Sequence, residues 1–525
     1  MTQRQIWLVL IGLMSGMFLS ALDQSVVGTA MRTIADDLKN LEAQAWVTTA
    51  YLITSTIATP IYGKLSDIFG RRRLFIWAIS IFIFGSALCG FATDMGELAA
   101  FRAVQGIGAG GLFSLAITVL ADIVPPRERA RYQGMFLAVF GSSSVLGPLV
   151  GGLFAGVDQI LWVDGWRWVF LINLPIGALA LVMVTAFLHV PHTPKKHRID
   201  WFGAASIVVA VVPILLVAEN GRDWGWLSSN SILMYALAVV GIVAFIFFER
   251  RAGDEAIMPL RLFKSRSFTM STIMGVIIGV GMFGGMMTIP LLLQIVLGAT
   301  PTESGFMMLP MVAGMMIGTT ISGQITSRTG KYKMFLSTGT GILTIGYAYM
   351  LGFTADSEYW WMSVGMFLVG LGLGQLMQTL TLVSQQSVPP SEIGVATSAA
   401  TFFRQMGGTL GVAVFISILF NNLANTIGDA FKDKKISADV LAAAQDPAVL
   451  ANPANVAFLK SMNGGGDAAA LGDQLKTDSS FLSEIDPRLA EPFKVGFANS
   501  AVQVFIWASV VVAVAFAMSF FVKAP

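Results

Sequence analysis

The chain has 525 residues, of which 55% are hydrophobic and only 12% are charged. Because soluble globular proteins carry about 25% charged residues, this composition excludes a soluble domain and indicates a protein whose main solvent is lipid. The net charge of +2 gives no reason to expect a nucleic-acid partner, and the single cysteine, Cys89, excludes a disulfide framework and a cysteine-based metal site.

Windows of about 20 mostly apolar residues predict a chain of membrane-spanning helices. The first follows Arg4 and is long enough to cross a bilayer, so we interpret it as a retained helix and not as a signal peptide. Fourteen spans are predicted, near 6–29, 46–64, 74–92, 97–121, 133–155, 166–188, 202–218, 231–248, 268–287, 303–326, 334–353, 360–384, 397–420 and 499–521. We interpret the three histidines within 189–197 as part of a solvated loop, and we expect no metal site.

Lys and Arg are distributed unevenly between the predicted loops. With the N-terminus inside, clusters such as Arg71–Arg73 fall on the inside, whereas short outside loops carry few basic residues, Arg32 and Lys39 among them. An even number of spans returns the C-terminus to the inside. We therefore expect a multi-pass protein of a bacterial plasma (inner) membrane, with both termini in the cytoplasm.

The segment 421–498, between the last two predicted spans, is the only sizeable water-exposed piece. It mixes charged residues with alanine and contains the run Gly464–Gly466. Short helices over 437–445 and 468–475 would make it a helical cap over the outer mouth. Of these two interpretations, we favour a partly ordered outside loop over a cap.

An internal repeat predicts the architecture. The loop Gly63–Arg73 resembles Gly323–Lys333, with its glycines offset by 260 residues, and the same offset relates further glycines within spans. These pairs are Gly110 with Gly370, Gly147 with Gly407, and Gly151 with Gly411. We predict an all-α membrane fold of two six-helix halves with two inserted helices, divided as 1–200, 201–266 and 267–525.

The loop Gly63–Arg73 joins two spans with glycines, one acid and three consecutive arginines. Glycine lets helix ends approach closely, and Asp67 can pair with Arg71 or with the arginines that follow Asp122. A plain positive-inside anchor is the alternative, but we favour a charge latch that locks one conformation. The predicted latch comprises Gly63, Asp67, Gly70, Arg71, Arg72, Arg73 and Asp122.

Two charged residues lie within predicted spans. Asp23 stands about two-thirds of the way along the first span, and Arg102 stands in the first third of the fourth. A charged side chain at membrane depth costs roughly 2.5–3.5 kcal/mol or more and marks a functional site. We predict that Asp23 carries a proton or binds a substrate cation; a structural partner for a nearby arginine or hydroxyl is the alternative. Arg102 pairs with backbone carbonyls, holds Asp23 deprotonated, or orders the inside half of its span.

Small and amide side chains mark further helix faces. In the fifth span a kinking Gly-Pro pair stands on a glycine-rich face that we expect to slide against the opposite half. Its residues are Gly141, Gly147, Pro148, Gly151 and Gly152. By the cost of burying amides in lipid, we predict that a substrate cavity is lined by Gln24, Gln105, Gln294, Gln375 and Gln378.

These motifs together resemble a known family. The loop Gly63–Arg73, the stretch Arg102–Gly110 and the glycines of the fifth span are similar to signatures of the major facilitator superfamily. The stretches Leu22–Met31 and Trp166–Gly177 resemble its fourteen-helix drug:proton antiporters of the EmrB/QacA type. The resemblance implies export driven by proton entry, with Asp23 as the proton-coupling acid, Arg102 assisting, and Asp67, Arg71 and Asp122 forming the latch.

The resemblance also sets the expected substrate. Relatives that export dications carry further acids in their second half, and none lies deep in the last six spans here, so neutral, zwitterionic or monocationic amphipathic compounds are favoured. We expect a multidrug, antibiotic-resistance type of exporter that is a monomer and uses no cofactor beyond the proton gradient. An exporter of a lipid, peptide or metabolite is the alternative, and a non-transporting receptor is a third. The lack of a phosphate-binding G-x-x-x-x-G-K-[ST] loop argues against an ATP-driven pump, and we expect no enzyme.

Overall fold

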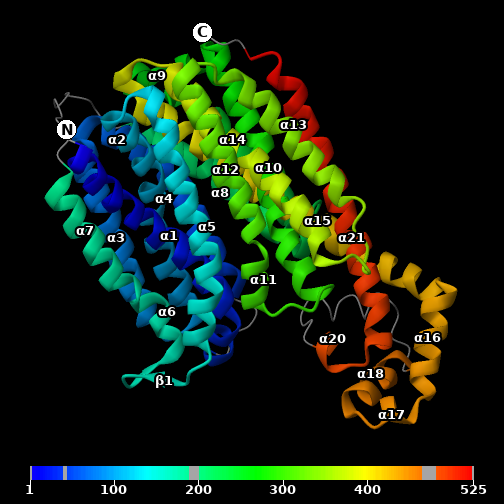
Figure 1. Cartoon of the computed structure of the whole chain (residues 1–525). Helices are drawn as coiled ribbons and strands as arrows, with labels where there is room; N and C mark the ends of the chain where they lie inside the picture. The colour runs from blue at the N-terminus through cyan, green and yellow to red at the C-terminus, as the bar shows by residue number, and fades with distance from the viewer. Residues whose placement is uncertain (1–2, 39–43, 189–199, 464–480, 523–525) are drawn as a thin grey trace.

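The computed structural model describes residues 3–38, 44–188, 200–463 and 481–522, and these are almost entirely helical (Figure 1). The first part of the chain forms long helices joined by short turns and one small β-hairpin. Its elements are α1 (Gln3–Asp37), α2 (Gln44–Phe69), α3 (Arg71–Gly90), α4 (Met95–Ile123), α5 (Pro126–Ala155), β1 (Gln159–Ile160), β2 (Val163–Asp164), η1 (Gly165–Arg167), α6 (Trp168–Leu171) and α7 (Asn173–Phe187). We call these the N half.

Two helices and a linker follow, and then a second set of long helices. The inserted pair is α8 (Trp201–Trp224) and α9 (Ser229–Ala252), followed by the linker turns η2 (Gly253–Glu255) and η3 (Leu260–Lys264). The C half comprises α10 (Arg266–Ile295), α11 (Pro301–Met307), α12 (Leu309–Thr329), α13 (Lys333–Met350), α14 (Tyr359–Gln386), η4 (Pro390–Glu392), α15 (Ile393–Lys432) and α21 (Pro487–Ser519). The helices between α15 and α21 are α16 (Lys434–Gln445), α17 (Pro447–Leu450), α18 (Pro453–Asn463) and α20 (Phe481–Glu484).

The turns between helices follow from local chemistry. The Asp94 carboxylate accepts the Glu97 backbone N–H at 2.9 Å and so caps α4. Gly70 and Gly330, one in each half, adopt φ of 93° and 71° at equivalent turns, a region that favours glycine. Both halves therefore have a glycine with positive φ at this turn, although Gly70 precedes α3 with ψ of 144° and Gly330 ends α12 with ψ of −5°.

In the described residues, eleven helices are long and apolar enough to cross a membrane. Three further helices, α2, α5 and α13, lie where the sequence predicts spans but do not meet that criterion along their described length. The all-α membrane fold is confirmed, whereas the number of fourteen spans stays a prediction. The three histidines and the predicted helix 468–475 lie outside the described residues.

The two halves repeat the same packing. In the N half, α4 packs against α2 and α3, and α1 packs against α5 and α7; in the C half, α14 packs against α12 and α13, and α10 packs against α15 and α21. Glycines separated by 260 residues occupy equivalent contacts: Gly110 faces the Ser55 carbonyl of α2, and Gly370 faces the Met311 carbonyl of α12. A side chain at either position would collide with backbone, so glycine is required for this approach.

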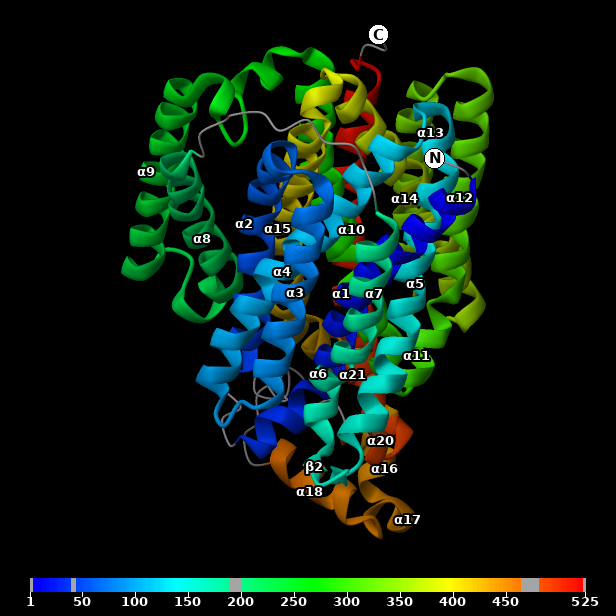
Figure 2. The same ribbon diagram turned by 90° about the vertical axis from the view of Figure 1, so that its left-hand side faces the viewer.

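The inserted pair lies at the seam between the halves. Helix α8 contacts α2, α15 and its partner α9, and Figure 2 shows the pair at one side of the molecule, next to α2 and α15. Ile207 and Val211 of α8 share one apolar core with Ile57 of α2 and with Val395 and Phe402 of α15. One helix therefore bridges both halves.

Within 421–498 the residues that the structure describes are mostly helical. Helix α15 continues to Lys432, α16, α17, α18 and α20 follow, and α21 already begins at Pro487. These helices bury Val440, Phe458 and Leu482 in the same core as Phe493 of α21; we call this packed unit the cap, and its place over an outer mouth stays a prediction. In Figure 1 the cap lies at the opposite end from the start of α1 and the end of α21. We call the end that carries the cap helices the cap end. We call the opposite end the latch end, because the loop 63–73 lies there.

Candidate functional site

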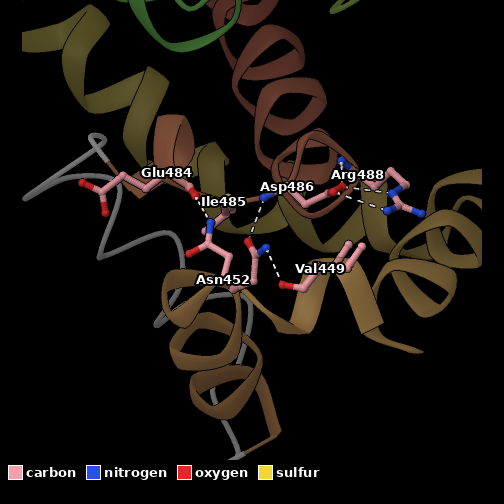
Figure 3. A pocket seen from close by; sticks show the side chains of 8 residues that line it. Val449, Asn452, Glu484, Ile485, Asp486 and Arg488 are labelled. Atoms are coloured by element: carbon pink, nitrogen blue, oxygen red, sulfur yellow. Dashed lines mark hydrogen bonds and ion pairs between the residues drawn. The ribbon is translucent and has the colours of Figure 1, made fainter. Parts of the chain in front are cut away.

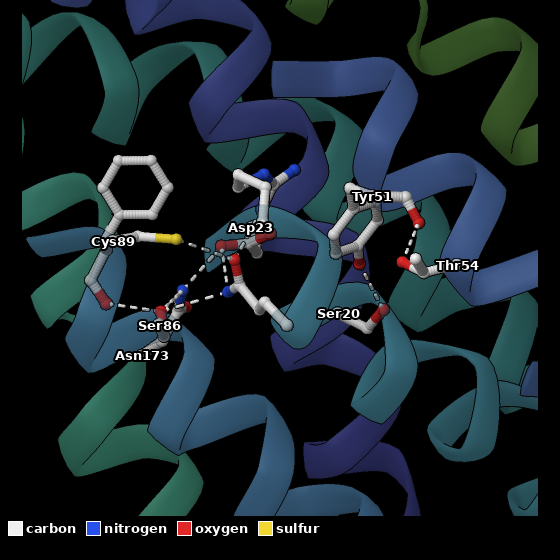
Figure 4. Close-up of polar contacts among 10 residues, drawn as sticks. Ser20, Asp23, Tyr51, Thr54, Ser86, Cys89 and Asn173 are labelled. Carbon is white, nitrogen blue, oxygen red and sulfur yellow. Dashed lines mark hydrogen bonds and ion pairs between the residues drawn. The ribbon is translucent and has the colours of Figure 1, made fainter. Parts of the chain in front are cut away.

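Asp23 lies at the centre of a buried polar cluster in the N half (Figure 4). Asp23 and Arg102 are each 1% exposed. Arg102 Nη1 donates to Asp23 Oδ2 at 2.5 Å. Of the interpretations left open for Arg102, the structure therefore realises the pairing with Asp23, and the pair joins α1 to α4.

Amides hold the second oxygen of the Asp23 carboxylate. Asp23 Oδ1 accepts from Asn173 Nδ2 at 2.7 Å and from Gln105 Nε2 at 2.9 Å. Both amides also donate to Ser86 Oγ, which in turn donates to the Phe170 carbonyl at 2.9 Å. The carboxylate is thus bound by three donors from α4 and α7.

An aromatic ring covers the other side of the arginine. The Arg102 guanidinium carbon lies 4.0 Å from the centroid of the Tyr51 ring of α2, a cation–π arrangement. The Tyr51 hydroxyl lies 3.0 Å from Ser20 Oγ of α1. Asp23 and Arg102 were predictable from the cost of buried charge. Asn173, Ser86 and Tyr51 were not chosen, although the polar Asn173 within an apolar run was a readable signal.

Two atoms of the cluster have no partner. Within the described part of the chain, Arg102 Nε and Asn173 Oδ1 are buried without a hydrogen bond. A buried donor or acceptor without a partner costs about 1–3 kcal/mol. The cluster therefore keeps a donor and an acceptor available for a second arrangement of its hydrogen bonds.

A second charged cluster lies at the latch end. Arg71 pairs with Asp67, donates from Nε to Asp122 Oδ2 at 2.8 Å, and donates from Nη1 to Ser66 Oγ at 2.5 Å. Two acids and one arginine therefore join α2, α3 and the end of α4 on one side of the N half.

This cluster also reaches the C half. Asp67 Oδ2 accepts the Val395 backbone N–H at 3.1 Å, in the first turn of α15, where the helix dipole favours an anion. Gly63 faces Ser398, and a Cβ on Gly394 would lie 2.5 Å from Asp67 Oδ1. Glycines on both sides therefore let α2 and α15 approach closely, as the latch prediction requires.

Arg72 and Arg73 lie outside this contact. Arg72 donates to the Thr185 carbonyl at the end of α7, at 2.5 Å, and Arg73 is exposed. Because neighbouring positions of a helix point in different directions, only Arg71 of the three faces α2 and α4. The other two belong to the surface and to packing within the N half.

Arg129 makes a second connection between the halves that the sequence reading missed. This buried side chain of α5 donates to Gln385 Oε1 of α14 at 3.1 Å and to the carbonyls of Ala121 and Val124 at the end of α4. Thr59 of α2 donates to Gln405 of α15 at 3.3 Å. With the Asp67 bond, these connections all lie towards the latch ends of their helices.

The glycine face of α5 divides between two neighbours. Gly147 and Gly151 pack against Ser25 and Val26 of α1, within the N half, so the expectation that they slide against the C half is wrong. Gly141 does face the C half, at Val312 of α12. A Cβ added to Gly152 would meet no other described helix within 4 Å, and Pro148 lies inside α5.

The five glutamines do not gather in one place. Gln105 belongs to the Asp23 cluster, Gln375 accepts from Thr338 of α13 at 2.8 Å, and Gln378 lies 3.5 Å from Ser322 of α12. Gln294 donates to Ser304 at 3.1 Å, and Gln24 is exposed. Four of these amides therefore join helices within one half, and their role as a cavity lining stays a prediction.

Comparison with known proteins agrees with this architecture. A family model described as Major Facilitator Superfamily matches residues 13–412. Over 423 residues the chain is 38% identical to the multidrug transporter protein MdtP of Bacillus subtilis (strain 168), covering 80% of this chain and 77% of that protein. Over 431 residues it is 37% identical to multidrug resistance protein 3 of the same organism, covering 82% and 83%.

The human organic anion transporter MFSD10 (TETRAN), known from a crystal structure, has a similar fold. The superposition has a TM-score of 0.57 at 13% sequence identity and covers 96% of this chain and 99% of that one. At this identity the likeness concerns the fold alone.

Proposed function

Since the chain belongs to the major facilitator superfamily, we propose that it exports amphipathic, drug-like molecules in exchange for protons. The names of its bacterial relatives, a multidrug transporter and a multidrug resistance protein, support drug efflux. The observation that supports proton coupling is the buried Asp23–Arg102 pair, a titratable acid at membrane depth within a cluster that has unused hydrogen-bonding atoms.

The cluster suggests how a proton is exchanged for substrate. A proton on Asp23 removes the negative charge that holds Arg102, so the guanidinium is free to turn towards other partners. The amides of Gln105 and Asn173 then donate to a neutral carboxyl, which is a weaker acceptor. Because these residues come from α1, α4 and α7, a change in the charge of Asp23 changes the packing of three helices of the N half.

The distribution of charge favours substrates with at most one positive charge. Arg404 of α15 is 7% exposed, and in the part of the chain that the structure describes no hydrogen bond or ion pair reaches its guanidinium. This cation repels a second positive charge on a substrate in the C half, in accord with the lack of deep acids there. We therefore propose neutral, zwitterionic or monocationic compounds as substrates.

The contacts between the halves support an outward-facing state. The hydrogen bonds of Asp67, Arg129 and Thr59 to the C half lie towards the latch end. We propose that the latch end faces the cytoplasm of a bacterium, that both termini lie there, and that the protein works in the inner membrane as a monomer without a bound cofactor. A closed cytoplasmic side then corresponds to the state that releases substrate.

Proteoliposomes with a trapped pH-sensitive dye and an acidic interior test the proposed exchange. Adding ethidium, a lipophilic monocation, should make wild-type vesicles lose internal acidity, and Asp23→Asn should reduce this response to that of protein-free vesicles. Asp94→Asn changes an exposed acid that caps α4 and should respond like wild type. Ethidium equilibration without a pH gradient, which requires no net proton movement, should persist in Asp23→Asn. Equal proton movement in wild type and Asp23→Asn would place coupling at another residue.

A further inference from the structure

The inserted pair ends in a buried acidic contact at the latch end. Asp200 immediately precedes α8, and Glu249 lies in the last turn of α9, just before the linker that leads to the C half. Neither acid belongs to the Asp23 cluster or to the latch. Helix α8 packs against both halves, so a contact at this end is placed where the halves meet.

Asp200 uses only one of its carboxylate oxygens. Its Oδ1 accepts the Gly203 backbone N–H at 2.7 Å and caps α8. Its Oδ2 is buried and has no hydrogen-bond partner among the residues that the structure describes. Capping explains the first oxygen but leaves the second one desolvated.

Glu249 repeats this arrangement. The residue is 1% exposed, and its Oε2 accepts the Met258 backbone N–H of the linker at 3.1 Å. Its Oε1 is buried without a hydrogen-bond partner. In each acid, one carboxylate oxygen therefore accepts a backbone N–H, and the other has no donor among the described residues.

Both unpartnered oxygens lie close to Gly203. A Cβ on Gly203 would touch Asp200 Oδ2 and would lie 3.1 Å from Glu249 Oε1. Both oxygens thus reach the same small space, which the absence of a side chain at Gly203 leaves open. Two ionised carboxylates facing each other in such a space repel, and neither finds a donor.

The charged surroundings do not provide that donor. Lys64 of α2 and Asp200 interact electrostatically with Glu249, and Arg261 of η3 and Glu392 beside α15 act on Lys64 in turn. Arg261 pairs with Glu392, and Arg250 and Arg251 of α9 are exposed. Among the residues that the structure describes, none of these groups donates a hydrogen bond to either free oxygen.

We propose that Asp200 and Glu249 bind one proton between them, forming a proton-binding site separate from Asp23. The proton sits on one free oxygen and is donated to the other, so that both oxygens gain a partner. The shared proton removes the repulsion between the two carboxylates. The site fixes the linker, through Met258, to the inserted pair when it is protonated.

Infrared spectroscopy of the full-length protein in lipid nanodiscs tests this directly. At neutral pH the wild-type spectrum should contain the carbonyl stretch of a protonated carboxylic acid, and this band should be lost as the pH is raised. Glu249→Gln and Asp200→Asn should each remove the band. Glu303→Gln is the matched control, because Glu303 also accepts a backbone N–H, at 2.8 Å, but is exposed; it should leave the band unchanged.

Thermal unfolding provides a second measurement. The stability that the proton contributes is present at low pH and is lost as the pH rises through the titration of the pair, so wild-type Tm should fall by about 2 °C or more across that range. Glu249→Gln carries its own N–H donor and should lose this dependence without losing stability. An Asp23→Asn background should keep it, which separates this site from the proposed proton exchange.

The opposing outcomes are equally definite. A wild-type spectrum without the acid band at neutral pH, or a band that survives both Glu249→Gln and Asp200→Asn, would overturn the proposal even if one variant fails to fold. Restoration of Tm at high pH by sodium, but not by choline, would also overturn it and would instead assign a bound metal cation to the two oxygens.

Discussion

At the scale of single residues, charge at membrane depth is tolerated because each charged group has partners prepared for it. The Asp23 carboxylate receives donors from Arg102, Gln105 and Asn173, and the Tyr51 ring lies against the arginine. Compared with apolar side chains of similar volume, such a buried ion pair adds little to the stability of the fold. Removing one partner is costly, because it leaves the other charge buried without its counter-charge. The pair is therefore better explained by the chemistry it permits than by stability.

A double-mutant cycle measures this dependence. Arg102→Met leaves Asp23 as an unpaired buried acid and should lower the stability of the protein by about 3–5 kcal/mol. Asp23→Asn combined with Arg102→Met removes both charges and should recover a large part of that loss. Thermal unfolding in detergent gives both values. Simple addition of the two single effects would mean that the two side chains do not depend on one another.

The sequence predicts charged residues of this cluster better than neutral ones. Asp23 and Arg102 stand out because a charge in lipid is expensive, whereas Ser86 and Asn173 cost much less and are common in helix packing. Their roles depend on which helices meet, since α3 and α7 approach α1 and α4 only in the folded N half. The same holds for Arg129, whose partner Gln385 lies in the other half.

At the scale of elements, the predicted spans locate the helices but not their ends. Windows of apolar residues put the last two spans at 397–420 and 499–521, whereas α15 runs on to Lys432 and α21 starts at Pro487. These extensions need an apolar face only where they pack against the cap helices or against each other. Leu423 and Ile427 of α15 and Phe493 and Phe497 of α21 form that face, since all four are buried in one core. A hydropathy window identifies segments that are apolar enough to lie in lipid, and it misses helical turns that only pack against other parts of the protein.

The cap should respond to acid through one arginine. Figure 3 shows Arg488 beside Asp486 and near Val449; its Nη2 lies 3.0 Å from Asp446 Oδ2, and its Nε lies 3.0 Å from Asp486 Oδ1. Hydrogen bonds from Arg488 lower the pKa of both acids below their usual value of 3.8. The stabilisation is therefore complete at neutral pH and is lost as the pH falls below about 4.

Limited proteolysis of the cap in proteoliposomes checks this. Wild-type cleavage should become several-fold faster at pH below about 4 than at pH 7, measured with an acid-active protease and corrected for its own pH profile. Arg488→Gln should be cleaved fast at both values. Lys432→Gln, which removes an exposed pair with Asp429, should behave like wild type, and acid sensitivity that persists in Arg488→Gln would refute the assignment.

At the scale of the whole molecule, the contact between the halves near Asp67 includes a few close approaches between α2, α3 and α15. Gly394→Val places side-chain atoms against Asp67 Oδ1 and Arg71, where even a Cβ would lie at 2.5 and 2.6 Å. We expect this wedge to separate α2 from α15 and to shift the population towards a state open at the latch end.

Labelling of a cysteine at the contact reports that shift. In a Cys89→Ser, Ser398→Cys background, a membrane-impermeant maleimide should react several-fold faster from the latch side once Gly394→Val is added, because Ser398 is fully buried in the closed contact. Gly275→Val on α10 is the matched control, since no atom lies within 4 Å of its added Cβ. Equal labelling in both variants would mean that the contact at Gly394 does not hold the halves together.

The direction of transport depends on which end faces the cytoplasm, and the positive-inside rule assigns that side to the latch end. Two exposed residues lie at opposite ends of the protein and can each be replaced by cysteine: Thr329, beside the loop 323–333, and Ala438, in the cap. In intact cells lacking Cys89, an impermeant maleimide should label Ala438→Cys at once and Thr329→Cys only after permeabilisation. The reverse labelling pattern would mean that the protein has the opposite orientation in the membrane. The closed latch would then seal the outer side, and the structure would represent a state that loads substrate from the cytoplasm instead of one that releases it.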